Sequence, residues 1–274
     1  MIRVSKILFS QFANDGRGFK QPPNAVTRQL FLKKNMKPSI PNAGITIIEA
    51  YQFNGGGGVD EHGLAYYPDV IEIGKSAFPN NNELKIANFP KATTINNSAF
   101  YNVKNVTEIN LPSAKTVGDQ ALSYCPSLEY VTLGADVSLG QSVFAGSRNL
   151  KMVTFLGRCT AAHSASFNSF ETQFMDFRGD VPSDIVGLNC ATKGVIIRSE
   201  TLQTLPRYGL ISTYILNQGN SFYYVPSSLV EAYKSEVIKK TSSLNDEIKI
   251  TCVRALEDYT VDGTITGDLD MSKI

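Results

Sequence analysis

Histidine and cysteine, the side chains most often used as metal ligands and nucleophiles, are rare in this chain and widely spaced. The 274 residues include His62, His163, Cys125, Cys159, Cys190 and Cys252. No CxxC pair occurs and neither histidine stands at ligand spacing, which argues against a zinc site. His163 lies among alanine and serine, and we interpret it as a surface or loop histidine. Four cysteines are too few for a disulfide scaffold of this length, so we expect reduced, mostly buried thiols.

The remaining groups that could perform catalysis stand apart from one another. The sequence contains no HExxH, GxSxG or Walker motif. Glycines 55–58 precede Val59 and Asp60 rather than the Lys-Ser or Lys-Thr of a phosphate-binding loop, so we interpret them as a flexible bulge. Acidic pairs such as Asp60-Glu61 and Glu257-Asp258 lie in predicted loops. We therefore predict no catalytic residue, no metal site, no cofactor and no enzymatic activity.

The apolar residues of the chain repeat with a period of 22 residues. The pairs Ala77-Phe78, Ala99-Phe100, Ala121-Leu122 and Val143-Phe144 fall at this interval. Three apolar columns keep the same step: Leu84, Val106, Leu128 and Leu150; Ile73, Ile95, Val117 and Leu139; and Tyr67, Phe89, Leu111, Leu133, Phe155 and Phe177. A period kept by several columns at once is typical of a solenoid in which each repeat forms one coil.

Each repeat contains two extended pieces. The pattern L-x-x-I-x-L, followed by a turn-forming residue, predicts a short strand because its last four residues alternate between core and solvent. A second extended piece precedes Ile95, Val117 and Leu139, and the Ala-Phe pair begins a tight turn. The sequence thus predicts a β-rich solenoid of short parallel strands.

Two side chains of each predicted strand point away from the core, on either side of its second apolar residue. They form an apolar column, with Tyr130, Met152 and Phe174, beside a polar column rich in Asn and Thr. Exposed aromatic and Met groups with a polar rim mark protein interfaces and sugar platforms. We predict a binding surface made of Glu108, Asn110, Tyr130, Thr132, Met152, Thr154, Phe174 and Asp176. The alternative is that the N-terminal arm or a neighbouring segment covers this stripe.

Charge is concentrated at the ends of the chain. The net charge is +1, yet residues 1–45 hold eight basic residues against Asp15, a net +7, which leaves −6 for the remainder. We expect an anchoring arm that contacts other proteins through Arg17, Lys20, Arg28, Lys33, Lys34 and Lys37. An acidic solenoid argues against nucleic acid binding. Oppositely charged ends lead us to expect a homo-oligomer with head-to-tail contacts; two solvated ends are the alternative.

Apolar runs in the sequence are short. No apolar run is long enough to cross a bilayer, so we expect no membrane span. The apolar block Ile7-Leu8-Phe9 is too short for the apolar core of a signal peptide, so we expect no secretory signal.

The C-terminal part departs from the period. Strand-like runs occupy residues 194–198 and 222–225, and residues 244–257 are a candidate final strand. Ser228 and Glu231 form a capping box before a helix with Leu229, Tyr233 and Val237 on one face. A helix at a solenoid end covers apolar groups and strand edges. We predict an irregular arm (1–44), a solenoid (45–193), an α/β cap with one helix (194–259) and an acidic tail (260–274).

The repeat unit resembles that of a known family. Ile95, Ala99-Phe100, Val106, Ile109 and Leu111-Pro112 follow the pattern of the BspA-like, or Treponema-type, leucine-rich repeat, and Cys125 stands where that family often has cysteine. The resemblance covers roughly residues 65–180. It implies a curved leucine-rich repeat solenoid that mediates adhesion and recognition.

The end of the chain resembles a second group of proteins. Residues 195–199, 223–234 and 261–264 are similar to the closing segments of leucine-rich repeat proteins encoded by phages and prophages of Gram-positive bacteria. This resemblance implies a structural or host-recognition protein of the virion. Its arm would contact other virion proteins, and its solenoid would contact a host surface protein or glycan. The alternative is an adhesin on the bacterial cell surface that binds host protein or glycan.

Overall fold

The computed structural model describes residues 42–162, 171–181, 191–206, 209–211, 213–241 and 243–258. The chain divides into two compact units, residues 40–256 and residues 1–39 with 257–274. Nearly all described residues belong to the first unit. This unit is a parallel-strand β-solenoid, as the 22-residue columns predict.

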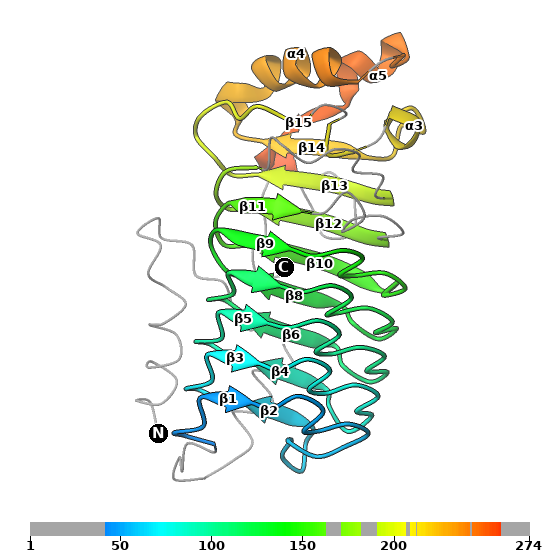
Figure 1. Ribbon diagram of the computed structural model, residues 1–274. Coiled ribbons are helices and arrows are strands. Elements are labelled where there is room, and N and C mark those ends of the chain that lie inside the picture. Colours follow the sequence, from blue (N-terminus) through cyan, green and yellow to red (C-terminus); the bar gives the residue numbers. More distant parts are fainter. Residues whose placement is uncertain are drawn as a thin grey trace, which may run out of the picture. The chain divides into compact units, whose positions relative to one another are not determined.

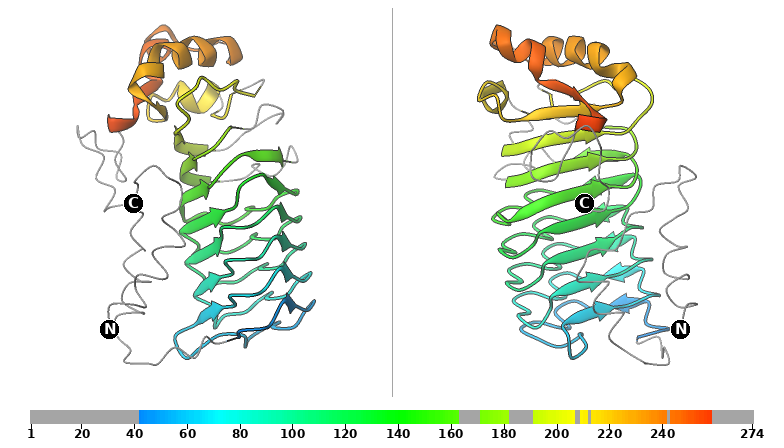
Figure 2. Two further views of the ribbon diagram at one scale, coloured as in Figure 1. Left: turned by 90° about the vertical axis from the view of Figure 1, so that its left-hand side faces the viewer. Right: turned by 180° about the vertical axis from the view of Figure 1, so that it is seen from behind.

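Two parallel sheets form opposite walls of the solenoid (Figure 1, Figure 2). The six-stranded sheet consists, in order, of β1 (Ile47–Ile48), β3 (Glu72–Ile73), β5 (Thr94–Ile95), β7 (Thr116–Val117), β9 (Val137–Leu139) and β11 (Cys159–Ala162). The nine-stranded sheet consists of β2 (Leu64–Tyr66), β4 (Ile86–Asn88), β6 (Glu108–Leu111), β8 (Tyr130–Leu133), β10 (Leu150–Phe155), β12 (Glu171–Phe177), β13 (Ala191–Ile197), β14 (Phe222–Val225) and β15 (Val253–Ala255). Each strand pairs with its counterpart in the next coil, so a sequence column becomes a ladder in space.

The predicted apolar columns form the core between the sheets. Leu84, Val106 and Leu128 are fully buried, and Leu150 is 1% exposed. Phe100 stacks on Phe78 with ring centroids 5.3 Å apart. Burying one such side chain contributes about 1.5–3 kcal/mol, so the stack of coils supplies the stability that a single coil lacks.

The Ala-Phe turns add a third ladder of backbone hydrogen bonds. The amide of Ser98 donates to the carbonyl of Asp119 at 2.8 Å, and that of Asn102 to Ser123 at 2.9 Å. Each regular turn enters and leaves through a left-handed residue, at Ser98 (φ 58°) and Asn102 (φ 56°) in this coil. Polar residues tolerate this conformation better than bulky ones, which explains the short polar residues beside the Ala-Phe pair.

The glycine run of residues 55–58 is an anchored loop at the first coil. The amide of Gly57 donates to Glu83 Oε2 at 2.8 Å, and Asn81 Nδ2 donates to the carbonyl of Gly57 at 2.9 Å. Gly58 has φ 70° and lies against the ring of Phe53. The interpretation of this run as a bulge is right in position, but side chains of the next coil hold the loop in place.

The expected domain boundaries fall inside continuous structure. The boundary after residue 193 lies within β13, and the nine-stranded sheet continues to β15 because parallel pairing does not depend on the 22-residue period. At the other end, Asn42 Nδ2 donates to the carbonyl of Tyr66 at 2.9 Å and the amide of Gly44 to Asp69 Oδ2 at 3.0 Å. Residues 42–44, assigned to the arm from sequence, therefore belong to the first coil.

Helices cover the C-terminal end of the sheet (Figure 1). They are α3 (Thr213–Leu216), the 3-10 turn η1 (Ser227–Leu229), α4 (Val230–Lys240), α5 (Asp246–Thr251) and the 3-10 turn η2 (Leu256–Asp258). The predicted helix is α4, and its predicted face is correct because Tyr233 and Val237 are fully buried. The segment expected as a final strand begins instead with α5, and β15 follows it.

The predicted capping box does not form. Pro226 precedes the 3-10 turn, so the N-cap of α4 is Leu229, one residue after Ser228, and it makes no side-chain cap. Glu231 instead accepts a hydrogen bond from Lys234 at 2.7 Å. An exposed pair of this kind contributes a few tenths of a kcal/mol, so burial of Tyr233 and Val237 dominates the docking of the helix.

Candidate binding surface

The two predicted outward columns lie where the sequence places them. In the nine-stranded sheet, Tyr130 pairs with Glu108 on one side and Met152 on the other, and Met152 pairs with Phe174. The polar column is equally straight and consists of Asn110, Thr132, Thr154 and Asp176. Neighbouring members therefore stand about 4.8 Å apart, one per coil.

The expectation that the apolar column is exposed is wrong for Met152 and Phe174, which are 5% and 2% exposed. Phe174 lies over Gly194, where an added Cβ would come within 2.9 Å of the ring, and its centroid is 6.4 Å from that of Tyr224. Met152 stands between Tyr130 and Phe174 in the ladder, so its column neighbours cover it in part. Of the three, only Tyr130 remains partly exposed.

The polar column is also largely withdrawn from solvent. Glu108, Thr154 and Asp176 are 8%, 3% and 1% exposed, whereas Asn110 and Thr132 keep partial exposure. Glu108 accepts a hydrogen bond from the side-chain amide of Asn110. The two columns therefore do not form a flat, open platform.

Asp176 is the centre of a buried charge cluster. Its carboxylate accepts hydrogen bonds from Arg198 Nε at 2.7 Å and Arg178 Nε at 3.3 Å. The side chains of Arg198 and Arg178 are 12% and 16% exposed, and Arg198 Nη2 is buried with no hydrogen-bond partner among the described residues. A carboxylate shared by two nearly buried guanidinium groups holds β12 to the end of β13, which is a structural role.

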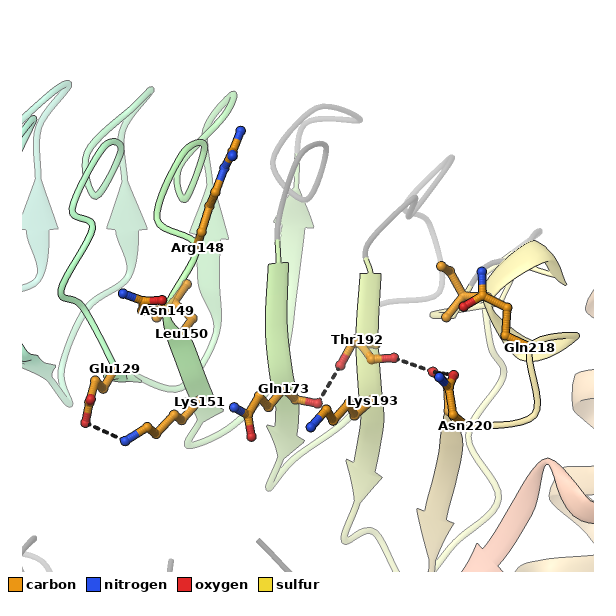
Figure 3. A pocket seen from close by; sticks show the side chains of 12 residues that line it. Glu129, Arg148, Asn149, Leu150, Lys151, Gln173, Thr192, Lys193, Gln218 and Asn220 are labelled. Carbon is orange, nitrogen blue, oxygen red and sulfur yellow. Dashed lines mark hydrogen bonds and ion pairs between the residues drawn. The ribbon is translucent and has the colours of Figure 1, made fainter. Parts of the chain in front are cut away.

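A polar groove opens beside these columns, where the strands β10, β12, β13 and β14 begin (Figure 3). Its volume is about 610 Å³. The lining residues in the described part of the chain are Glu129, Arg148, Asn149, Leu150, Lys151, Gln173, Thr192, Lys193, Ile215, Gln218, Asn220 and Ser221. Three are cations and one is an acid, and most of the others carry an amide or a hydroxyl group.

One row of side chains runs along the groove. Glu129, Lys151, Gln173 and Lys193 each stand one residue before the outward apolar column (Figure 3). Lys151 Nζ lies 3.0 Å from Glu129 Oε2, and this hydrogen bond raises the pKa of Lys151. Lys193 is exposed. The row therefore begins with a neutralised pair and ends with a solvated cation.

The base of the groove is held by hydroxyl groups. Thr192 Oγ1 donates to the carbonyl of Gln173 at 3.0 Å, and Ser221 Oγ donates to the carbonyl of Thr192 at 2.7 Å. Both hydroxyl-bearing residues are buried. These contacts join β12, β13 and the start of β14, so the row above them stands on a fixed frame.

Sequence reasoning missed this groove for two reasons. Lys193 follows Gln173 by 20 residues rather than 22, and Gln218 and Asn220 come from a segment without the period. The sequence does contain a signal for the groove. The residues directly before the outward apolar column are Glu129, Lys151 and Gln173, which recur at a regular step of 22. The predicted core and outward columns do not include that position.

Several predicted residues lie outside the described part of the chain. They are the six arm cations Arg17, Lys20, Arg28, Lys33, Lys34 and Lys37, together with His163 and Cys190. Cys125, Cys159 and Cys252 are buried, as expected for structural thiols. Burial raises the pKa of Cys125 to about 12 and that of Cys252 to about 11, so neither is a thiolate at neutral pH.

Within the described ranges, no three or more His, Cys, Asp or Glu side chains form a group that could hold a metal ion. Over the same residues, no helix combines the length and the apolarity needed to cross a bilayer.

Comparison with known proteins identifies the repeat. The model of the BspA type leucine-rich repeat region matches residues 25–137 and 71–183 and counts six copies. A solved leucine-rich repeat protein from Bacteroides ovatus ATCC 8483 is 17% identical, with a TM-score of 0.27. That match covers 66% of this chain and 55% of the other, so the chain spans about half the length of that protein. No curated protein matches the sequence.

Proposed function

The chain belongs to the BspA-type leucine-rich repeat family, and from this premise we propose that it is a non-enzymatic recognition protein whose solenoid binds a partner macromolecule. The observation that carries the proposal is the in-register stack of coils, which fixes side chains of successive repeats about 4.8 Å apart over many strands. Such a frame suits an extended partner, because it offers a long row of contacts rather than a closed catalytic pocket.

The absence of a catalytic role is part of the same proposal. Asp176 supports this view because two arginines occupy its carboxylate. The buried thiol of Cys125 supports it as well, since its raised pKa keeps that thiol protonated at neutral pH. Leucine-rich repeats of this family are typically scaffolds for protein contacts, and protein binding is the coarse function that follows.

More specifically, we propose that the protein is a structural or host-recognition component of a phage virion. The similarity of residues 195–199 and 223–234 to the closing segments of phage-encoded repeat proteins supports this assignment. The charge of the N-terminal residues supports an anchoring arm, because a net +7 over residues 1–45 suits an acidic assembly partner. A bacterial cell-surface adhesin is the alternative.

Labelling of purified particles tests the virion assignment. Gold-labelled antibody against the chain should decorate phage particles from cells that encode it, and should leave the surface of those cells unlabelled before lysis. Labelled cells with unlabelled particles would favour the adhesin and overturn the virion assignment. Labelling of neither, with the chain retained inside the cells, would contradict both locations.

Removal of the arm tests the anchor. Deleting residues 1–41 is preferable to deleting residues 1–44, because Asn42 and Gly44 contact the first coil. We expect the shortened chain to keep the circular dichroism and melting temperature of the full chain and to be absent from particles. A matched variant replaces the six arm cations by glutamine. Normal incorporation of that variant would show that charge is not what anchors the arm.

A further inference from the structure

We infer that the groove at the start of strands β10, β12, β13 and β14 binds an anionic polysaccharide, which lies along the row formed by Glu129, Lys151, Gln173 and Lys193. This inference rests on the proposed recognition function and names a class of ligand for it. No catalytic step is involved.

The sign of the charge is the first argument. Residues 46–274 carry a net charge of −6, since the chain is +1 overall and residues 1–45 are +7. Among the described lining residues the groove reverses this sign, because Arg148, Lys151 and Lys193 stand against one acid, Glu129. A local excess of positive charge concentrates anions at the groove.

The position of the free charge is the second argument. Glu129 already accepts a hydrogen bond from Lys151, whereas Lys193 forms no ion pair with any of the described residues. An anionic group would therefore favour the Lys193 end of the row and avoid the Glu129 end. Removing the charge of Lys193 should therefore lower the affinity for an anion, and removing the charge of Glu129 should raise it.

The chemistry of the lining favours a polysaccharide over an acidic peptide. Peptide interfaces depend on apolar or aromatic anchors that enter desolvated pockets. Among the described lining residues, the aliphatic ones are Leu150, which is 1% exposed, and the partly buried Ile215. Amides are abundant instead, from Asn149, Gln173, Gln218 and Asn220, and they donate to and accept from sugar hydroxyl groups.

The shape of the row favours a polymer. Glu129, Lys151, Gln173 and Lys193 belong to four successive coils, so three steps of about 4.8 Å give the row a length of roughly 14 Å. The row runs across the strands, along the axis of stacking (Figure 3). A chain of sugars laid along this axis would meet one side chain per coil.

Binding of the purified full chain to defined polymers tests the inference. The anionic probes are polygalacturonate, which carries carboxylates, and dextran sulfate, which carries sulfates; the neutral control is dextran, and polyglutamate represents an acidic peptide. We expect binding to one or both anionic polysaccharides and not to dextran, with affinity falling as NaCl rises from about 50 mM to about 500 mM. Comparison of the two anionic probes identifies which anionic group the groove accepts.

Variants localise the binding to the groove. Lys193→Gln should weaken it roughly 3- to 10-fold, as expected for one charged contact at a partly solvated site. Glu129→Gln should strengthen it, because an acid is removed beside the anion. The matched control Lys115→Gln removes an exposed cation directly before β7 of the six-stranded sheet, outside the groove, and should change nothing. A gain of affinity on removal of Glu129 is not what a merely destabilised protein would show.

Three results would overturn the inference. The first is that the chain binds neither anionic polysaccharide. The second is that Lys193→Gln, Glu129→Gln and Lys115→Gln bind with equal affinity. The third is that polyglutamate binds more strongly than either polysaccharide. The last result would identify an acidic peptide as the partner. None of them bears on whether the chain is found in particles, so failure of the inference and failure of the proposed function are distinguishable.

Discussion

Replacement of Asp176 by asparagine should destabilise the junction between β12 and β13. The aspartate side chain is 1% exposed, and its carboxylate is shared by Arg198 and Arg178 at 2.7 and 3.3 Å. Asparagine keeps the shape but removes the charge. Two guanidinium groups, 12% and 16% exposed, would then remain beside the sheet without their counter-ion.

The size of the effect follows from burial. Breaking a buried ion pair by removing one partner costs about 3–5 kcal/mol, whereas an exposed pair contributes about 0.2–1 kcal/mol. We expect about 3 kcal/mol, because the arginines keep some contact with water and the asparagine oxygen still accepts one hydrogen bond. For a unit of this size, that loss lowers the melting temperature by roughly 6–12 °C.

Urea unfolding followed by circular dichroism measures the loss, and hydrogen exchange locates it. The matched control is Asp136→Asn, because Asp136 pairs with Arg158 at 3.4 Å while the two side chains are 65% and 56% exposed. We expect less than about 1 kcal/mol for the control. Equal losses in the two variants, or unchanged exchange in β12 and β13, would refute the structural role of Asp176.

Three further predictions follow from burial in the core. Phe100→Ala removes a fully buried ring that stacks on Phe78, and it should lower the free energy of unfolding in urea by about 3–5 kcal/mol. Tyr214→Ala, at a residue that is 75% exposed, should stay within about 0.5 kcal/mol, and a similar loss in both would contradict this assignment of the core. Cys125 should resist iodoacetamide at neutral pH until urea is added, as read by mass spectrometry; rapid labelling of the folded chain would show that the thiol is accessible. Because its pKa rises from 9.0 to about 12 on folding, the unfolded state loses the proton first, so stability should fall as pH rises above about 9, and Cys125→Ala should reduce that slope.

The solenoid could be predicted from sequence because one coil cannot satisfy its own apolar side chains. Leu84, Val106 and Leu128 recur at one step, and burial of all three requires that the coils stack in register. The C-terminal part was harder because its strands have no such step. β14 was located by its apolar run, but α5 was not predicted because six residues carry too little helical periodicity to outweigh a nearby strand signal.

Exposure of the outward columns could not be predicted, although their alignment could. Alternation along a strand tells which wall a side chain faces, but burial also depends on its column neighbours and on segments distant in sequence. Phe174 shows the difference: its outward position follows from the pattern, whereas its burial depends on Gly194 and Tyr224, which lie beyond the regular repeats. Asp176 is a similar case, since Arg198 comes from the part of the chain that the repeat does not describe.

The groove lies where the repeat loses its regularity. From Glu129 to Lys151 to Gln173 the step is 22 residues and the strands pair in register. From Gln173 to Lys193 the step is 20 residues; the strands still pair in register, and the segment that bears Gln218 and Asn220 lines the groove beside Lys193. The regular coils therefore hold one end of the row, and a segment outside the period supplies part of the lining at the other. Recognition by this protein should depend more on the side chains near Lys193 than on the most regular columns of the solenoid.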